Sequence, residues 1–287
     1  MAIIRNLKHL KGSSDRYYFG LPVNATDTNP LYLDIVEKTY RELTKLIARY
    51  TRTVLIRLDL VPGNVNPYHI DLTKFCRSFK RKLETKYKSE VVYQWVREHG
   101  RNDYNEGFHW HLWVGVKSHD DFQPDTQSRH MQDLIIEAWK LRAGKTARNQ
   151  KTSWFYIQRQ YLSLDNRLKE QKLISEGGRD VLVNMSKLLT RRNNKSVALG
   201  GVIDECFYAL SYLAKVYTKV RTPGSKDLKI FSGTNITTKK MSVHREAEVE
   251  KQLDLIHVQL SQPITPIPIT TERLIKYPKR KYVPKAD

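Results

Sequence analysis

Two histidines separated by one residue are the clearest chemical signal in the chain. His109 and His111 lie in the run Phe-His-Trp-His-Leu-Trp-Val at positions 108–114. Alternate side chains of a β-strand point to the same face, so a strand over this run places both imidazoles together. Two imidazoles on one face provide half of a metal site. An isolated His-x-His is weak evidence, because a pair of hydrogen-bonded surface histidines gives the same pattern, so further ligands are needed.

Carboxylates near this run are candidates for a third ligand. Glu98 ends the preceding apolar run and falls at the mouth of a hairpin, where it would lie beside His109. Asp59, on an earlier strand, competes for this role, and Glu106 in the connecting loop is a weaker candidate. A solvated charge or an ordinary salt bridge is the alternative for each carboxylate. Two nitrogens and a carboxylate favour a divalent metal, Mn²⁺ or Mg²⁺, with Mn²⁺ the better match and positions left open for a phosphate oxygen.

A tyrosine and a lysine three residues apart are candidates for a nucleophile and its support. The expected helix over residues 204–220 has a polar side that carries Tyr208, Tyr212, Lys215 and Lys219. A phenol with a pKa of about 10 is a poor nucleophile at neutral pH, so Tyr212 would need a lysine and a metal-polarised phosphate beside it. Lys215 would hold that phosphate or lower the pKa of the phenol. Tyr-x-x-K alone is unspecific, and the alternative is a Tyr212 that stacks on a base or packs.

The order of these motifs resembles that of the HUH endonucleases, which initiate rolling-circle replication, and in particular the replication initiators of filamentous phages and related prophage elements. The likeness spans about residues 51–235 and rests on the runs Arg-Leu-Asp-Leu at 57–60, Trp-Val-Arg-Glu at 95–98, His-Trp-His at 109–111 and Tyr-Leu-Ala-Lys at 212–215. The resemblance implies a tyrosine that attacks a phosphodiester of single-stranded DNA, leaving a 5′-phosphotyrosine and a free 3′-hydroxyl, with a divalent ion on the histidine pair.

Carried over residue by residue, the resemblance assigns the nucleophile to Tyr212, the metal ligands to His109 and His111, and support of the phosphate to Lys215. Two features depart from the family pattern. The gap between Glu98 and the histidines is longer than in many members, which leaves the third ligand open. Tyr208, one turn before the expected nucleophile, resembles the second tyrosine of initiators that nick twice, or else is an aromatic side chain beside the DNA path.

Hydrophobic periodicity predicts the elements that position these groups. Helices are expected over residues 32–50, 71–87, 128–143, 204–220 and 244–260, and strands over residues 53–61, 91–98, 108–116 and 151–162. Asp71 is placed to cap the second helix and Gly144 to end the third. The two strands on either side of the polar loop at 99–107 predict an antiparallel hairpin.

These elements predict an α+β fold with a central antiparallel β-sheet that carries His-x-His on a central strand. The helices that begin at Asp71 and Ser128 are expected on one face, and the tyrosine-bearing helix over the other, with the histidine face open to DNA. The expected division is residues 1–50 as an N-terminal segment and helix, 51–235 as the HUH-like domain, and 236–287 as a C-terminal extension with a basic, proline-containing tail.

The charge of the chain favours a polyanionic partner. Its 287 residues contain 50 Lys and Arg against 30 Asp and Glu, a net charge of +20, so counterion release would drive binding to nucleic acid. Lys219, Arg191 and Arg192 are the basic residues expected to contact DNA. An anionic membrane is the weaker alternative, because the longest apolar runs are too short to span a bilayer. Two distant cysteines, Cys76 and Cys206, form no disulfide framework and indicate a reducing cytoplasm, that of a bacterial host.

The function expected from these observations is metal-dependent, site-specific nicking and rejoining of single-stranded DNA at a replication origin of a phage or mobile element. Host helicase and replication proteins are the further expected partners. A relaxase or single-strand transposase would use the same residues on a different DNA structure. A basic DNA-binding regulator would use neither the histidines nor Tyr212 for chemistry, and would form no covalent adduct with DNA.

Overall fold

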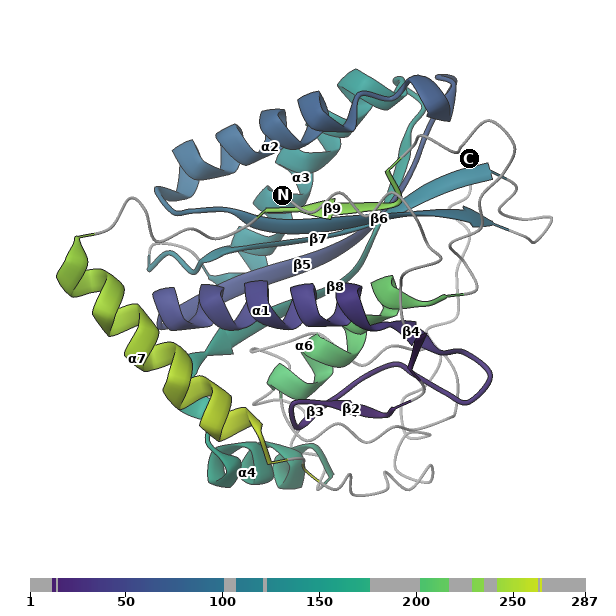
Figure 1. The fold of residues 1–287 in the computed structure, drawn as a ribbon. Coiled ribbons are helices and arrows are strands. Elements are labelled where there is room, and N and C mark those ends of the chain that lie inside the picture. The colour runs from purple at the N-terminus through teal and green to yellow at the C-terminus, as the bar shows by residue number, and fades with distance from the viewer. Residues whose placement is uncertain are drawn as a thin grey trace, which may run out of the picture.

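One five-stranded antiparallel sheet organises the fold (Figure 1). The computed structural model describes residues 12–13, 15–100, 107–120, 123–175, 202–216, 229–234, 242–262 and 264. The strands lie in the order β8 (Arg148–Gln158), β5 (Arg52–Val61), β7 (Gly107–Lys117), β6 (Val92–Gly100) and β9 (Phe231–Gly233). The histidine strand, β7, is therefore the central strand, as the sequence predicts.

The hairpin predicted around the histidines is confirmed. Strands β6 and β7 pair antiparallel, with Glu98 opposite His109 and His99 opposite Phe108. Strand β5 pairs with the other edge of β7 and places Asp59 opposite His111. Directly opposed residues of an antiparallel pair point to the same face, so both carboxylates share the face of the two histidines.

Two helices cover one face of the sheet, as expected (Figure 1). These are α2 (Leu72–Tyr87) and α3 (Pro124–Ala143). The Asp71 carboxylate accepts a hydrogen bond from the Lys74 amide and caps α2. Helix α3 begins four residues earlier than the pattern indicates and ends at Gly144, whose φ of 93° favours glycine. The apolar side chains of this layer pack against Trp110, Leu112 and the other residues that alternate with the histidines.

The expectation that the histidine face is open to DNA is wrong for most of that face. Helices α1 (Leu33–Arg49), α6 (Val202–Ser211) and α7 (Val243–Leu260) form a second apolar layer there (Figure 1). The same face of β7 carries Trp113 and Gly115 beyond the histidines, and α1 lies directly on them. A Cβ at Gly115 would lie 2.6 Å from Leu46 Cδ2, so this glycine permits the close contact.

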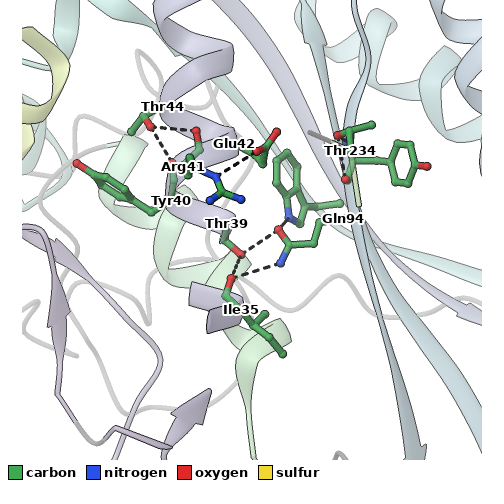
Figure 2. A network of polar contacts seen from close by, with 10 residues as sticks. Ile35, Thr39, Tyr40, Arg41, Glu42, Thr44, Gln94 and Thr234 are labelled. Carbon is green, nitrogen blue, oxygen red and sulfur yellow. Dashed lines mark hydrogen bonds and ion pairs between the residues drawn. The ribbon is translucent and has the colours of Figure 1, made fainter. Parts of the chain in front are cut away.

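A buried polar network fixes α1 to strands β6 and β7 of the sheet (Figure 2). Gln94 Oε1 lies 3.1 Å from both the Thr39 hydroxyl and the Trp113 indole nitrogen, and Gln94 Nε2 donates to the Ile35 carbonyl over 3.4 Å. Every polar group of the Gln94 amide therefore has a partner, which a buried amide requires. Thr234 follows the edge strand β9. Its hydroxyl accepts a hydrogen bond from the Tyr93 amide of β6, and its own amide donates to the Tyr93 carbonyl (Figure 2).

The remaining elements are short or peripheral. Two-residue strands pair as β1 (Gly12–Ser13) with β4 (Leu31–Tyr32) and as β2 (Tyr17–Tyr18) with β3 (Leu21–Pro22). Single 3₁₀ turns cover Pro67–His69 and Arg159–Tyr161, and α4 spans Leu164–Ser175. Strand β4 leads directly into α1. Cys76 and Cys206 are both buried and free, in different apolar layers.

Three buried carboxylates and one arginine join α4 to the start of α6. Arg167, which is fully buried, pairs through two nitrogens with Asp204 and also donates to carbonyls at the end of α7. Glu170 accepts a hydrogen bond from the Val202 amide. Burial raises the pKa of Glu170 to about 7. Burial, with help from the neighbouring carboxylates, raises the pKa of Glu205 to about 8.

Replacing Glu205 with glutamine is expected to flatten the pH dependence of stability. Because the folded protein holds a proton on Glu205 that an unfolded glutamate releases near its ordinary pKa of 4.5, the free energy of unfolding falls as the pH rises from about 5 towards 8. The variant should lose about 1 kcal/mol per pH unit of this slope. Urea unfolding at pH 5, 6 and 7 measures it, with Glu250→Gln on the exposed side of α7 as the control. If the free energy of unfolding varies with pH in the same way in wild type and in Glu205→Gln, the pKa of Glu205 is not raised in the folded protein.

Candidate functional site

Glu98, His109 and His111 form a group that could hold a metal ion. Their ligand atoms all lie within 4.8 Å of one another. Glu98 Oε2 lies 3.0 Å from His111 Nε2 and 3.5 Å from His109 Nε2, so one carboxylate oxygen approaches the same nitrogen of each ring. The placement of Glu98 beside His109, inferred from the hairpin, is confirmed.

The group combines a buried interior with one partly open side. The side chains of Glu98 and His111 are 1% and 5% exposed, whereas that of His109 is 20% exposed. Two imidazole nitrogens and one carboxylate oxygen are a donor set that divalent transition metals accept. The group fits a metal in one further respect: three ligands from two neighbouring strands leave coordination positions for further ligands on the open side.

Asp59 lies on the opposite side of the His111 ring from Glu98. Its Oδ1 is 2.5 Å from His111 Nδ1, and Asp59 lies outside the group of three that could hold the metal. A metal-ligating histidine commonly gives its second ring nitrogen to a carboxylate, which fixes the ring and directs the other nitrogen to the metal. Asp59, which the sequence left as a competing ligand, thus has the position of a supporting partner for His111.

The neighbouring carboxylates favour the protonated form of His111 when no cation is bound. Burial opposes the charged imidazolium, but Glu98 and Asp59 outweigh that effect and raise the pKa of His111. Burial likewise opposes ionisation of Asp59, yet hydrogen bonding to His111 and the charge of Arg57 hold the pKa of Asp59 below its ordinary value. A metal ion at Nε2 would therefore take the place of a proton.

Metal binding is accordingly expected to weaken at low pH. Below the raised pKa of His111, each pH unit should reduce the affinity for Mn²⁺ by about tenfold, because a proton must leave before the metal binds. Isothermal titration calorimetry between pH 5.5 and 8, in two buffers with different ionisation enthalpies, measures both the affinity and the protons released. An affinity that stays constant across this range would show that His111 is not a ligand.

The tyrosine segment departs from the predicted continuous helix. Helix α6 ends at Ser211, and Tyr212–Ala214 form a single 3₁₀ turn, so the predicted continuous helix is wrong over residues 212–216, and residues 217–220 fall outside the described part of the chain. The chain is drawn away by contacts with the N-terminal region. Lys215 forms a β-bridge with Leu31, and the Val216 amide donates to the Pro30 carbonyl. These long-range contacts place Tyr212 at the end of α6 rather than within it.

This turn brings Tyr212 to Glu98, His109 and His111, the candidate metal-binding residues that are called the metal group below. The rings of Tyr212 and His111 meet edge to face with centroids 5.2 Å apart. Two cations also approach the tyrosine ring: Lys215 Nζ lies 3.9 Å and the Arg57 guanidinium carbon 4.3 Å from its centroid. A phenol, two imidazoles, a carboxylate and two cations therefore meet at one place on the sheet.

The other predicted site residues either lie elsewhere on α6 or fall outside the described residues. Tyr208 is half-buried on α6, and burial raises the pKa of its phenol. Its carbonyl accepts a hydrogen bond from the Ser211 hydroxyl. The remaining candidates, Glu106, Arg191, Arg192 and Lys219, fall outside the described residues, as does most of the predicted C-terminal tail.

The comparisons with known proteins identify no family for this chain. No family model matches the sequence, and a search of curated proteins finds no match. Within the part of the chain that the structure describes, no helix has both the length and the apolar character needed to cross a bilayer.

Arg57 is the site residue whose contacts sequence reasoning missed. In the sequence it stands out only as the first residue of the run Arg-Leu-Asp-Leu at 57–60. Its spacing of two from Asp59 was an available signal, since residues two apart on a strand share a face. Its contact with Tyr212 depends on where α6 ends, and no local pattern encodes that.

Proposed function

We propose that the protein nicks and rejoins single-stranded DNA at a specific site through a covalent 5′-phosphotyrosine formed by Tyr212, and so starts rolling-circle replication of a phage or related mobile element. The proposal is carried by the edge-to-face contact between Tyr212 and His111. A candidate nucleophile and a candidate metal group that are far apart in the sequence share one site. The net charge of +20 supports a nucleic acid as the substrate.

The reaction would exchange one phosphodiester bond for another. The phenol oxygen of Tyr212 attacks phosphorus and gives up its proton to solvent or a base. The bond from phosphorus to the 3′ oxygen breaks, and that oxygen gains a proton to become a free hydroxyl. Because a phosphodiester is conserved at each step, attack by a 3′-hydroxyl on the phosphotyrosine reverses the reaction without ATP.

Each side chain of the site has a defined part in this scheme. Glu98, His109 and His111 would hold Mn²⁺ or Mg²⁺, and such an ion supplies Lewis acidity that offsets charge on the phosphate oxygens. Asp59 orients His111 through Nδ1. Lys215, whose ammonium group lies 3.9 Å from the Tyr212 ring centroid, adds positive charge where the phenol and the phosphate become negative.

The test is a covalent-capture experiment with labelled DNA. The protein is incubated with Mn²⁺ and a pool of random-sequence single-stranded oligonucleotides, then boiled in detergent. Oligonucleotides labelled at the 3′ end should leave label on the protein, because the 5′-phosphotyrosine retains the fragment downstream of the nick. Oligonucleotides labelled at the 5′ end should not, because that fragment leaves with the free 3′-hydroxyl.

The outcomes separate the enzyme from a DNA-binding regulator. Mass spectrometry of the labelled peptide should identify Tyr212, and EDTA should prevent labelling. A regulator would bind the same oligonucleotides and give no detergent-resistant label with either end. That result, with duplex DNA and Mg²⁺ also negative, would reject the proposal.

A further inference from the structure

Arg57 lies on the floor of the site and touches three of its parts. It is on β5, two residues from Asp59 and opposite Trp113, so its side chain rises on the histidine face. Its Nη1 donates to the Ala209 carbonyl over 3.0 Å, and its Nη2 lies 3.6 Å from Asp59 Oδ1. Its guanidinium carbon lies 4.3 Å from the Tyr212 ring centroid.

These contacts join the nucleophile to the metal group through one side chain. Ala209 belongs to the last turn of α6, which leads directly into Tyr212. Asp59 holds His111. A planar guanidinium can donate in two directions and present its face to a ring at once, whereas an ammonium group is a single compact charge. The Arg57 side chain is only 11% exposed, and shielding from water strengthens attraction between a cation and an aromatic ring.

We infer that Arg57 is a positioning residue that holds the Tyr212 phenol in register with the metal group, an inference that rests on the proposed function. The physical reason is that a tyrosine ring at the end of a helix otherwise turns about its side-chain bonds. Displacing a reacting atom by about 1 Å can cost on the order of a hundredfold in rate. Arg57 limits that motion by anchoring the backbone before the tyrosine and attracting the ring itself.

Two substitutions test the charge of Arg57 and the shape of its guanidinium. Arg57→Gln removes the positive charge, while Arg57→Lys keeps the charge and loses the planar guanidinium. Adduct formation is measured in single turnover at saturating DNA and Mn²⁺. We expect Arg57→Gln to slow this step by about tenfold or more, and Arg57→Lys to restore part of the loss. Arg52→Gln, at the far end of the same strand, is the matched control and should keep the wild-type rate.

Separate binding measurements show whether the effect lies in positioning. The dissociation constants for single-stranded DNA and for Mn²⁺ should change by no more than about threefold in Arg57→Gln, because Arg57 is not a metal ligand. Thermal unfolding of each variant checks that the fold is retained, and if Arg57→Gln does not fold, Arg57→Lys alone must be slower than wild type.

The possible failures are distinguishable. If wild type forms no adduct at Tyr212, the proposed function fails and the inference fails with it. If wild type forms the adduct and Arg57→Gln reacts at the same rate, only the inference on Arg57 is overturned. A loss of Mn²⁺ affinity that accounts for the slower rate would also overturn it, since Arg57 would then act through Asp59 on the metal group.

Discussion

Replacing Tyr212 with phenylalanine is expected to abolish the covalent adduct while leaving DNA binding nearly unchanged. The substitution removes one oxygen and keeps the ring, so the contacts with His111, Arg57 and Lys215 can persist. With no phenol oxygen at this site, the rate of adduct formation should fall by more than about a thousandfold. Detergent-resistant labelling measures the first effect, and fluorescence anisotropy with single-stranded DNA measures the second.

The matched control is Tyr208→Phe. Tyr208 lies one helical turn before Tyr212 and is half-buried, and the structure gives only Tyr212, among the two, a ring contact with the metal group. We therefore expect Tyr208→Phe to keep the adduct rate within about threefold of wild type. An adduct that survives in Tyr212→Phe and maps to Tyr208 would reverse the assignment, and adducts on both residues would support an initiator that nicks twice.

Replacing Glu98 with glutamine is expected to weaken Mn²⁺ binding far more than replacing Asp59 with asparagine. Glu98 is the one carboxylate in the group that could hold the metal, and an amide oxygen brings no negative charge. Asp59 supports His111 from the other side of the ring. Losing such a supporting partner costs about 10–100-fold in metal affinity, and Asp59→Asn should lie near the lower limit because asparagine can still accept from Nδ1. Glu98→Gln should exceed the upper limit.

Competition with a fluorescent chelator measures both affinities in the absence of DNA. Glu90→Gln is the control, because Glu90 is a half-buried carboxylate outside the group that pairs with Arg49, and Mn²⁺ binding should not change. The reverse order of effects, with Asp59→Asn the weaker binder, would make Asp59 the ligand and Glu98 its support. Equal and small effects would show that no divalent ion binds at this place.

Local patterns in the sequence were sufficient for most of the architecture. The apolar stripe of α2 and its Asp71 cap depend on residues three or four apart, and the alternation along β7 depends on residues two apart. The pairing of Glu98 with His109 followed because the two strands are joined by one short loop. In each case the residues that carry the pattern and those that form the structure are close together in the sequence.

The features that sequence reasoning missed depend on contacts between distant residues. The end of α6 at Ser211 is set by Pro30 and Leu31, and the covering of the histidine face is set by α1 packing on Gly115. Asp204, expected at the start of its helix, lies in the first turn of α6, where it is buried against Arg167. None of these partners is marked by spacing, since the deciding quantity is the shape of the layer that packs on the sheet.

The central position of β7 has a consequence for how the metal group can open. Strand β7 is paired with β5 on one side and β6 on the other, with His111 in register with both strands and His109 with β6. Trp110 and Leu112 are buried in the opposite apolar layer. Backbone hydrogen bonds in a central, buried strand are among the last in a domain to open. An ion would therefore have to enter and leave by rotation of side chains on the His109 side, over a backbone that stays closed.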